Sequence, residues 1–205
     1  QLITDTDDAL TSKLIGFAIS FNSDNGYYFA FNESNKSIIQ KLLKNEEITI
    51  IGFDLKFSIK LLHKHNIQIN SKLFDVQIAH YLLHPDMRNS LNIISENYLG
   101  TILREKESIL GKGKTKSMFS ELKQSMIADY ACERSLAIFK LYKPLRKKMV
   151  AEGVLKLFDK IELPLITVLA KMEIEGIALN VNMLNNFSVE LTKKLSEIRD
   201  KIHNL

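Results

Sequence analysis

The chain has 205 residues, of which 45% are hydrophobic and 25% charged, and these are the values of an ordinary globular protein. They exclude a disordered chain, a collagen-like repeat and a small disulfide scaffold, and no apolar run is long enough for a transmembrane helix. No basic segment followed by an apolar one opens the chain, so no signal peptide is expected. The single cysteine cannot form an internal disulfide, and 28 basic against 24 acidic residues leave a net charge of +4. We therefore expect a cytoplasmic protein whose positive charge permits a polyanionic partner.

The first third of the chain predicts strands. Residues 14–21 are apolar almost throughout, which is typical of a strand covered on both faces, and residues 27–31 are expected to return beside it as a hairpin. Residues 35–44 have helical spacing, and residues 48–51 form a short apolar stretch that ends at a glycine. This pattern indicates a sheet with helices packed against it.

The rest of the chain is predominantly helical in pattern. A second amphipathic helix starts near Leu55, and Asp75 is expected to cap a helix over 76–83. A long helix is expected from about 121 to 151, and a final charged amphipathic helix from 181 to the C-terminus. Strands first and helices later predict a compact α/β unit of roughly 150 residues that carries a helical tail.

Three familiar kinds of site have weak support. Residues 113–115 read Gly-Lys-Thr, but a phosphate-binding loop requires a glycine where Ser108 stands and a buried strand before it. His80 and His84 have a spacing that suits zinc, yet no glutamate or cysteine partner accompanies them. Cys132 has no activating base nearby in the sequence. We interpret all three as structural features.

Five stretches of the sequence, taken in order, carry a family resemblance. They are Ile-Gly-Phe-Asp-Leu-Lys-Phe-Ser at 51–58, Leu-Phe-Asp with Ala-His-Tyr-Leu-Leu at 73–83, Gly-Lys-Gly-Lys at 111–114, Tyr-Ala-Cys-Glu-Arg-Ser at 130–135, and Ile-Glu-Leu-Pro-Leu with Met-Glu and Gly-Ile at 161–177. In this order and spacing they resemble the 3′–5′ proofreading exonuclease region of bacterial DNA polymerase I, a family-A polymerase. The resemblance covers essentially the whole chain.

The resemblance implies a fold, partners and a chemistry. It implies an RNase H-like exonuclease fold, a mixed sheet flanked by helices, over residues 1–152, followed by a helical connection and the start of the polymerase thumb over 153–205. It also implies a parent DNA-directed DNA polymerase of DNA replication and repair, with DNA and the polymerase module of the same parent chain as partners. The polymerase site itself is not expected in this stretch. In such exonucleases four carboxylates hold two divalent ions, Mg²⁺ or Mn²⁺, which activate a water molecule.

This sequence departs from the family pattern at all four carboxylate positions. In the first motif they fall on Gln1 and Ile3, in the second on Ser58, and in the third on Arg134. The tyrosine that orients the attacking water in the family is present as Tyr130. We therefore expect no catalytic residue, no bound metal and no cofactor, which makes the chain a vestigial exonuclease domain.

The expected loss of metal binding has an electrostatic reason. A serine hydroxyl is a weak neutral ligand, isoleucine is no ligand, and Arg134 carries a permanent positive charge. At an effective dielectric constant near 20, two unit charges about 4 Å apart interact by roughly 4 kcal/mol, and a dication doubles that repulsion. The leading hypothesis is a structural module that guides DNA through three lysines, Lys56, Lys112 and Lys114.

One alternative keeps the enzyme active. Asp5 and Asp7 would serve as the first motif if the following connection were shorter, and Asp54 lies on the same helical face as the second-motif position. Asp129 and Glu133 flank the third position. This alternative is a metal-dependent 3′–5′ exonuclease with shifted carboxylates, which would need Mg²⁺ or Mn²⁺. A third hypothesis is a basic α/β domain that binds nucleic acid without catalysis.

Overall fold

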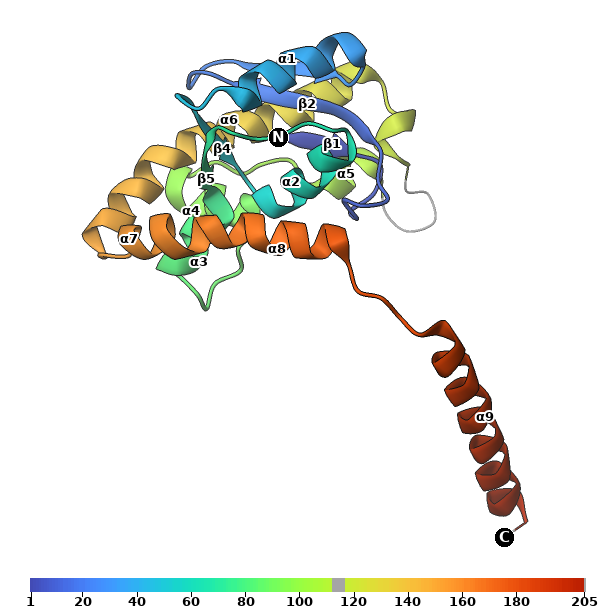
Figure 1. Ribbon diagram of the computed structural model, residues 1–205. Coiled ribbons are helices and arrows are strands. Elements are labelled where there is room, and N and C mark those ends of the chain that lie inside the picture. Colours follow the sequence, from blue (N-terminus) through green and yellow to red (C-terminus); the bar gives the residue numbers. More distant parts are fainter. Residues whose placement is uncertain (112–116, 205) are drawn as a thin grey trace. The chain divides into compact units, whose positions relative to one another are not determined.

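The computed structural model describes residues 1–111 and 117–204 (Figure 1). Strands and helices alternate in the first part: β1 (Leu2–Thr4), β2 (Leu14–Ser20), β3 (Gly26–Ala30), α1 (Glu33–Lys44), β4 (Thr49–Gly52), α2 (Leu55–Lys64), β5 (Lys72–Asp75), α3 (Val76–Leu83), α4 (Leu91–Leu99) and α5 (Lys106–Leu110). The second part is helical: a 3₁₀ turn η2 (Phe119–Glu121), α6 (Gln124–Ala151), α7 (Leu155–Leu157), a π turn η3 (Phe158–Glu162), α8 (Leu163–Glu175) and α9 (Val181–His203).

The chain forms two compact units, Gln1–Ile174 and Glu175–Leu205. All the strands of the described residues and the helices that cover them belong to the first unit, whereas α9 makes up most of the second. The functional boundary expected between residues 152 and 153 stays a prediction. None of the helices in the described ranges combines the length and the apolar character that a membrane span requires.

The strands form two sheets. In the first sheet β2 lies between β1 and β3 and pairs antiparallel with both, in a register that places Leu2 opposite Phe17 and Phe17 opposite Phe29. In the second sheet β4 and β5 pair in parallel. The hairpin and the short buried strand expected from the sequence are confirmed.

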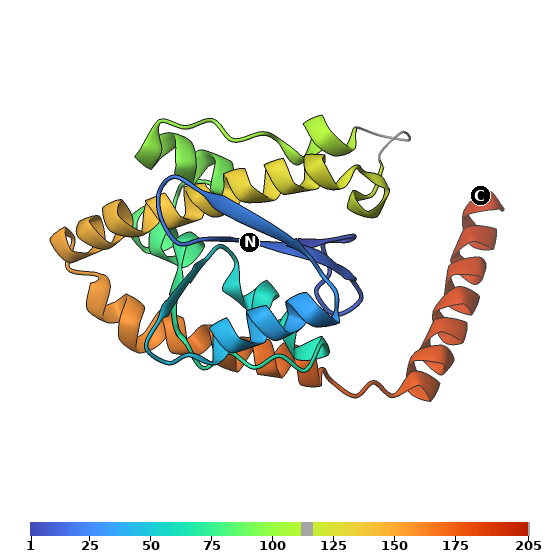
Figure 2. The same ribbon diagram turned by 90° about the horizontal axis from the view of Figure 1, so that it is seen from above.

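Helices cover both faces of the first sheet, as the view in Figure 2 shows. On one face α1 and α2 pack their apolar side chains around Phe17, and on the other face α6 packs around Ile3 and Ala18. A larger core joins α3, α4 and α6 around β5 and includes Phe74, Leu141 and other fully buried residues. Because both faces are covered, β2 has the apolar sequence of a central strand.

Helix α6 is 28 residues long and takes part in two of these cores. Its first half contributes Ile127, Tyr130 and Ala131 to the core against the first sheet, whereas its second half contributes to the core around β5. The helix lies close to β3 at one glycine: a Cβ atom at Gly26 would come within 2.9 Å of the Cβ atom of Cys132. A larger residue at position 26 would therefore push the helix and the sheet apart.

The structure refines three predictions about elements. Asp75 is confirmed as the N-cap of α3, since its side chain accepts hydrogen bonds from the backbone N–H groups of Gln77 and Ile78. The long helix begins at Gln124 rather than near 121, because residues 119–121 form the separate turn η2. Strands β1 and β5 were not expected; with three and four residues they are too short for a clear alternating pattern.

Candidate active site

The first-motif positions lie on β1. Ile3 is 3% exposed and packs in the same apolar core as Tyr130, because β1 presents alternate residues to the α6 side of the sheet. Gln1 uses its backbone rather than its side chain to join the sheet: its α-ammonium donates to the carbonyl oxygen of Ala18 over 2.9 Å. Its side-chain amide donates to the carbonyl oxygen of Leu2. Neither residue presents an anionic oxygen at the site.

The second-motif position lies in the first turn of α2. Ser58 donates its hydroxyl to the carbonyl oxygen of Asp54 over 3.3 Å. Asp54 is the N-cap of the helix: its backbone is in the left-handed region, with φ 52°, and its carboxylate accepts from the N–H of Phe57 over 3.1 Å. The carboxylate nearest to this position in sequence therefore stabilises the start of the helix.

The third-motif residues lie on α6. Tyr130 is 5% exposed, and burial raises the pKa of its phenol, so the hydroxyl stays protonated. The guanidinium of Arg134 lies over the ring of Tyr130, 5.1 Å from its centroid, and donates to Oδ1 of Asn92 over 3.1 Å. The ion pairs found among the described residues do not include Arg134. A positive charge therefore occupies this end of the site without a carboxylate partner.

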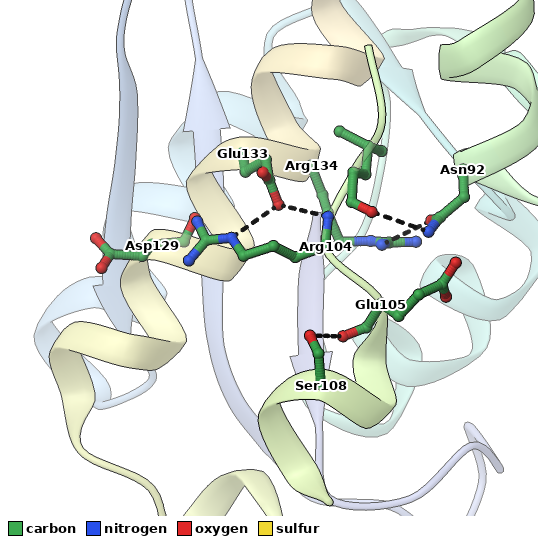
Figure 3. A network of polar contacts seen from close by, with 8 residues as sticks. Asn92, Arg104, Glu105, Ser108, Asp129, Glu133 and Arg134 are labelled. Carbon is green, nitrogen blue, oxygen red and sulfur yellow. Dashed lines mark hydrogen bonds and ion pairs between the residues drawn. The ribbon is translucent and has the colours of Figure 1, made fainter.

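A second arginine holds the acidic neighbour of Arg134 (Figure 3). The Nε atom of Arg104 and its backbone N–H both donate to Oε2 of Glu133 over 3.2 Å, and another guanidinium nitrogen donates to the carbonyl oxygen of Asp129 over 3.0 Å. The charge of Glu133 is thus balanced by Arg104. Sequence reasoning missed Asn92 and Arg104, because they lie 42 and 29 positions from their partners on α6 and belong to no motif.

The shifted carboxylates of the alternative hypothesis have separate contacts. Asp5 accepts from the backbone N–H of Lys13 over 2.7 Å, so it closes the turn between β1 and β2. Asp7 is largely exposed and forms an ion pair with Lys106. Asp54 caps α2, as described above. The contacts of these three carboxylates thus lie in a turn, in an exposed ion pair and at a helix start, and none of them links one of the three to another.

The lysines expected to guide DNA are only partly described. The Nζ atom of Lys56 donates to Oε1 of Glu173 over 2.6 Å, and Lys60 pairs with the other oxygen of the same carboxylate. The hydrogen bonds from Lys56 and Lys60 lower the pKa of Glu173 below its usual value. Lys112 and Lys114 lie outside the described residues. Lys56 is 39% exposed and thus reaches solvent from within an ion pair.

One carboxylate of the unit is deeply buried, and its contacts are structural. Asp75 is 1% exposed; one oxygen accepts from the N–H of Leu55 over 2.7 Å, and the other accepts from the N–H groups of Gln77 and Ile78. Burial raises its pKa to about 6, although the three hydrogen bonds oppose this shift. Its side chain joins the end of β5 to the starts of α2 and α3.

Comparison with known proteins places this geometry in a family. The family model described as DNA polymerase I, ribonuclease H-like domain, matches residues 2–141. The chain belongs to this family. Its relatives include DNA polymerase I of Borreliella burgdorferi, 31% identical over 95% of this chain and 22% of that protein, and DNA polymerase I of Bacillus subtilis, 27% identical over 94% and 22%. The chain thus spans about a fifth of the length of these relatives.

Two solved structures share the fold. The POL domain of Pol1 from M. smegmatis, in complex with DNA primer-template and dNTP, has a TM-score of 0.77 and 19% identity over 96% of this chain and 31% of that one. Brucella melitensis NrnC bound to pGG has a TM-score of 0.71 and 18% identity over 86% of this chain and 83% of that one. The RNase H-like α/β fold with a C-terminal helical region, expected from the sequence, is confirmed.

The residues at the four motif positions do not fit the two divalent cations that the family resemblance implies. They offer one amide, one isoleucine, one hydroxyl and one guanidinium, whereas hard cations need several anionic oxygens. Within the described ranges, no three His, Cys, Asp or Glu side chains lie close enough together to hold a metal ion. The only motif residue with its family identity, Tyr130, is packed against Ile3 and Arg134.

Proposed function

We propose that this chain is a vestigial exonuclease module of a DNA polymerase I, without nuclease activity, that supports the polymerase module of the same parent chain and guides DNA. The observation that carries the proposal is the contact of Arg134 with Tyr130. A guanidinium lies 5.1 Å from the tyrosine ring, and it occupies the position where the family pattern has a carboxylate. The core that contains both Ile3 and Tyr130 supports the same conclusion from the opposite side of the site.

The role in guiding DNA is the less direct part of the proposal. It depends on the net charge of +4 and on Lys56, Lys112 and Lys114. The pairing of Lys56 with Glu173 reduces the charge that Lys56 presents, so we assign the larger share of phosphate contact to the other two lysines. Polymerisation is assigned to the parts of the relatives that lie outside the matched stretch.

The second candidate function is a metal-dependent 3′–5′ exonuclease that uses Asp5, Asp7 and Asp54. The acidic residues near the start of the chain motivate it. It would require these side chains to leave their contacts with the Lys13 N–H, with Lys106 and with the start of α2 before they met at a metal. Arg134 would still place a positive charge beside that metal. We therefore rank it second.

A nuclease assay with matched variants separates the two functions. The purified chain is incubated with 3′-labelled single-stranded DNA and Mg²⁺ or Mn²⁺, alongside the triple variant Asp5→Asn, Asp7→Asn, Asp54→Asn. We expect both proteins to leave the DNA at full length. Shortening by the unchanged chain that the triple variant lacks would establish the second function. Equal shortening by both proteins, still present after further purification, would reject both accounts of the site.

DNA binding is measured in the same samples without divalent ions. We expect binding that weakens between 50 and 200 mM salt, because each phosphate contact releases counterions. The double variant Lys112→Ser, Lys114→Ser is expected to reduce the slope of log K against log salt by about 0.7 for each lost contact with single-stranded DNA. The matched control is Lys193→Ser, Lys194→Ser on α9. An unchanged slope in the first variant would remove these lysines from the proposal.

A further inference from the structure

Two strand edges in the first unit face each other without a strand between them. β2 pairs with β3 along Ile19 and Ser20, but on its other side β1 reaches only to Gln1, which is opposite Ala18. β4 pairs with β5 on one side only. In the described ranges no strand pairs with the remaining edge of either one. Open edges of this kind present backbone N–H and C=O groups that require partners.

A cavity of about 330 Å³ fills the space between these edges. The end of β2 lines it on one side and β4 on the other, while α1 and α2 close one face and α6 the other. The lining is largely apolar and includes Ile19, Phe21, Ile39, Ile50 and Ile138. Folded proteins contain few voids larger than a water molecule, so a cavity of this size indicates a missing occupant.

The first residue of the chain lies at the entrance of this cavity. Figures 1 and 2 both place the N-terminus between β1 and β4, and Gln1 lines the cavity. Its α-ammonium donates to the carbonyl oxygen of Ala18, and burial lowers its pKa to about 6. A peptide N–H at the same place would donate the same hydrogen bond without a buried charge. The cavity thus suits a chain that continues from the amino group of Gln1.

The register of β1 and β2 defines how such a segment would lie. Because Gln1 is opposite Ala18, the three residues before Gln1 would lie opposite Ile19, Ser20 and Phe21 in turn. Side chains alternate along a strand, so the first residue before Gln1 would share the α1 face with Leu2, and the second would share the α6 face with Ile3. Both faces are apolar, so the segment itself must be apolar at successive positions.

We propose that this cavity is a strand-acceptor site for an extended apolar segment joined to the amino group of Gln1, which inserts between β2 and β4 and unites the two sheets. A compact apolar ligand would fill part of the volume but would leave both edges unpaired. A strand from a second copy would have to pass the charged amino group of Gln1 at the entrance. A continuous segment avoids both difficulties.

The test compares three versions of the full chain that differ only before Gln1. The first carries five added residues of valine and isoleucine, and the second carries five residues of glycine and serine. The third carries the first extension with proline as the second residue before Gln1. That residue would be opposite Ser20, where its N–H is needed for the ladder, as the N–H of Ala18 is needed opposite Gln1.

We expect the valine and isoleucine extension to raise the Tm by about 5 °C or more over the glycine and serine extension, and proline to remove at least half of that gain. Hydrogen exchange at the amide of Ser20 and at the β4 amides is expected to slow at least tenfold, while exchange in α9 stays unchanged. Equal Tm and equal exchange in the first two proteins would overturn the proposal. Protection of Ser20 without protection of β4 would also overturn it, because the segment would then not join the sheets.

Discussion

Asp75 and Arg134 are both charged side chains at joints of the same compact unit, but their surroundings differ. Asp75 is 1% exposed and accepts three backbone hydrogen bonds, so every part of its carboxylate is used by the fold. Arg134 is only partly buried, donates one hydrogen bond to a neutral amide and lies over one ring. The first side chain connects three elements, whereas the second fills the end of a site.

The difference teaches that burial and hydrogen bonding, rather than charge, separate a structural group from a group at a site. A carboxylate that satisfies three buried N–H groups cannot be replaced without leaving donors unpaired. A guanidinium with a neutral partner leaves nothing uncompensated when it is removed. Changes at the two residues should therefore differ in size and in their dependence on pH.

The largest effect is expected at Asp75. Asp75→Ala leaves the N–H groups of Leu55, Gln77 and Ile78 without acceptors and should lower the free energy of unfolding by about 3–5 kcal/mol. The measurement is urea unfolding followed by circular dichroism. Asp24→Ala, at an exposed turn position, is the control and should change stability by less than about 0.5 kcal/mol. A loss below about 1 kcal/mol at Asp75 would show that water replaces the carboxylate.

The next effect is a dependence on pH. The pKa of Asp75 is raised to about 6 in the folded chain from 3.8, so between these values the folded state holds a proton that the unfolded state has released. Its contribution to stability is therefore complete below pH 4 and is lost as the pH rises to 6, by roughly 2–3 kcal/mol.

The Asp75→Asn variant isolates this dependence, because asparagine does not titrate. The stability of the unchanged chain minus that of the variant is expected to fall between pH 4 and pH 6 in parallel urea titrations. A constant difference across that range would mean that the three N–H groups hold the carboxylate ionised throughout.

The smallest effect is expected at Arg134. Arg134→Met keeps a long side chain against Tyr130 but removes the hydrogen bond to Asn92 and the cation–π contact, for a loss of about 1 kcal/mol. Differential scanning calorimetry is the measurement, with Arg199→Met on the exposed face of α9 as its control. A loss above about 3 kcal/mol would place Arg134 with Asp75 among the structural groups and remove the contrast between them.

Much of the fold followed from periodicity and turn residues. β2 and β3 have long or flanked apolar patterns, and α9 follows its amphipathic stripe, so local sequence was enough to predict them. β1 and β5 were missed because short strands become strands through their partners rather than through their own pattern. The division into two sheets was not foreseen either, since strand pairing is a long-range property.

The site was predicted by position and not by contact. The sequence identified Ile3, Ser58, Tyr130 and Arg134 through motif order, and the structure brings Ile3, Tyr130 and Arg134 to the same region of α6. It did not reveal Asn92 or Arg104, because hydrogen bonds across 42 and 29 positions depend on how α4 and the following loop pack on α6. Such contacts require the tertiary structure.

The length of α6 has a consequence for how such a module can lose its chemistry. One rigid rod carries the residues of the site at its start and the main core from Ala137 to Met149 farther along. Its distance from the sheet is set at Gly26, beside Cys132, where no methyl group intervenes. The scaffold is therefore anchored by a part of the rod that the reaction never touches, and side chains at its beginning are free to change function while the frame stays upright.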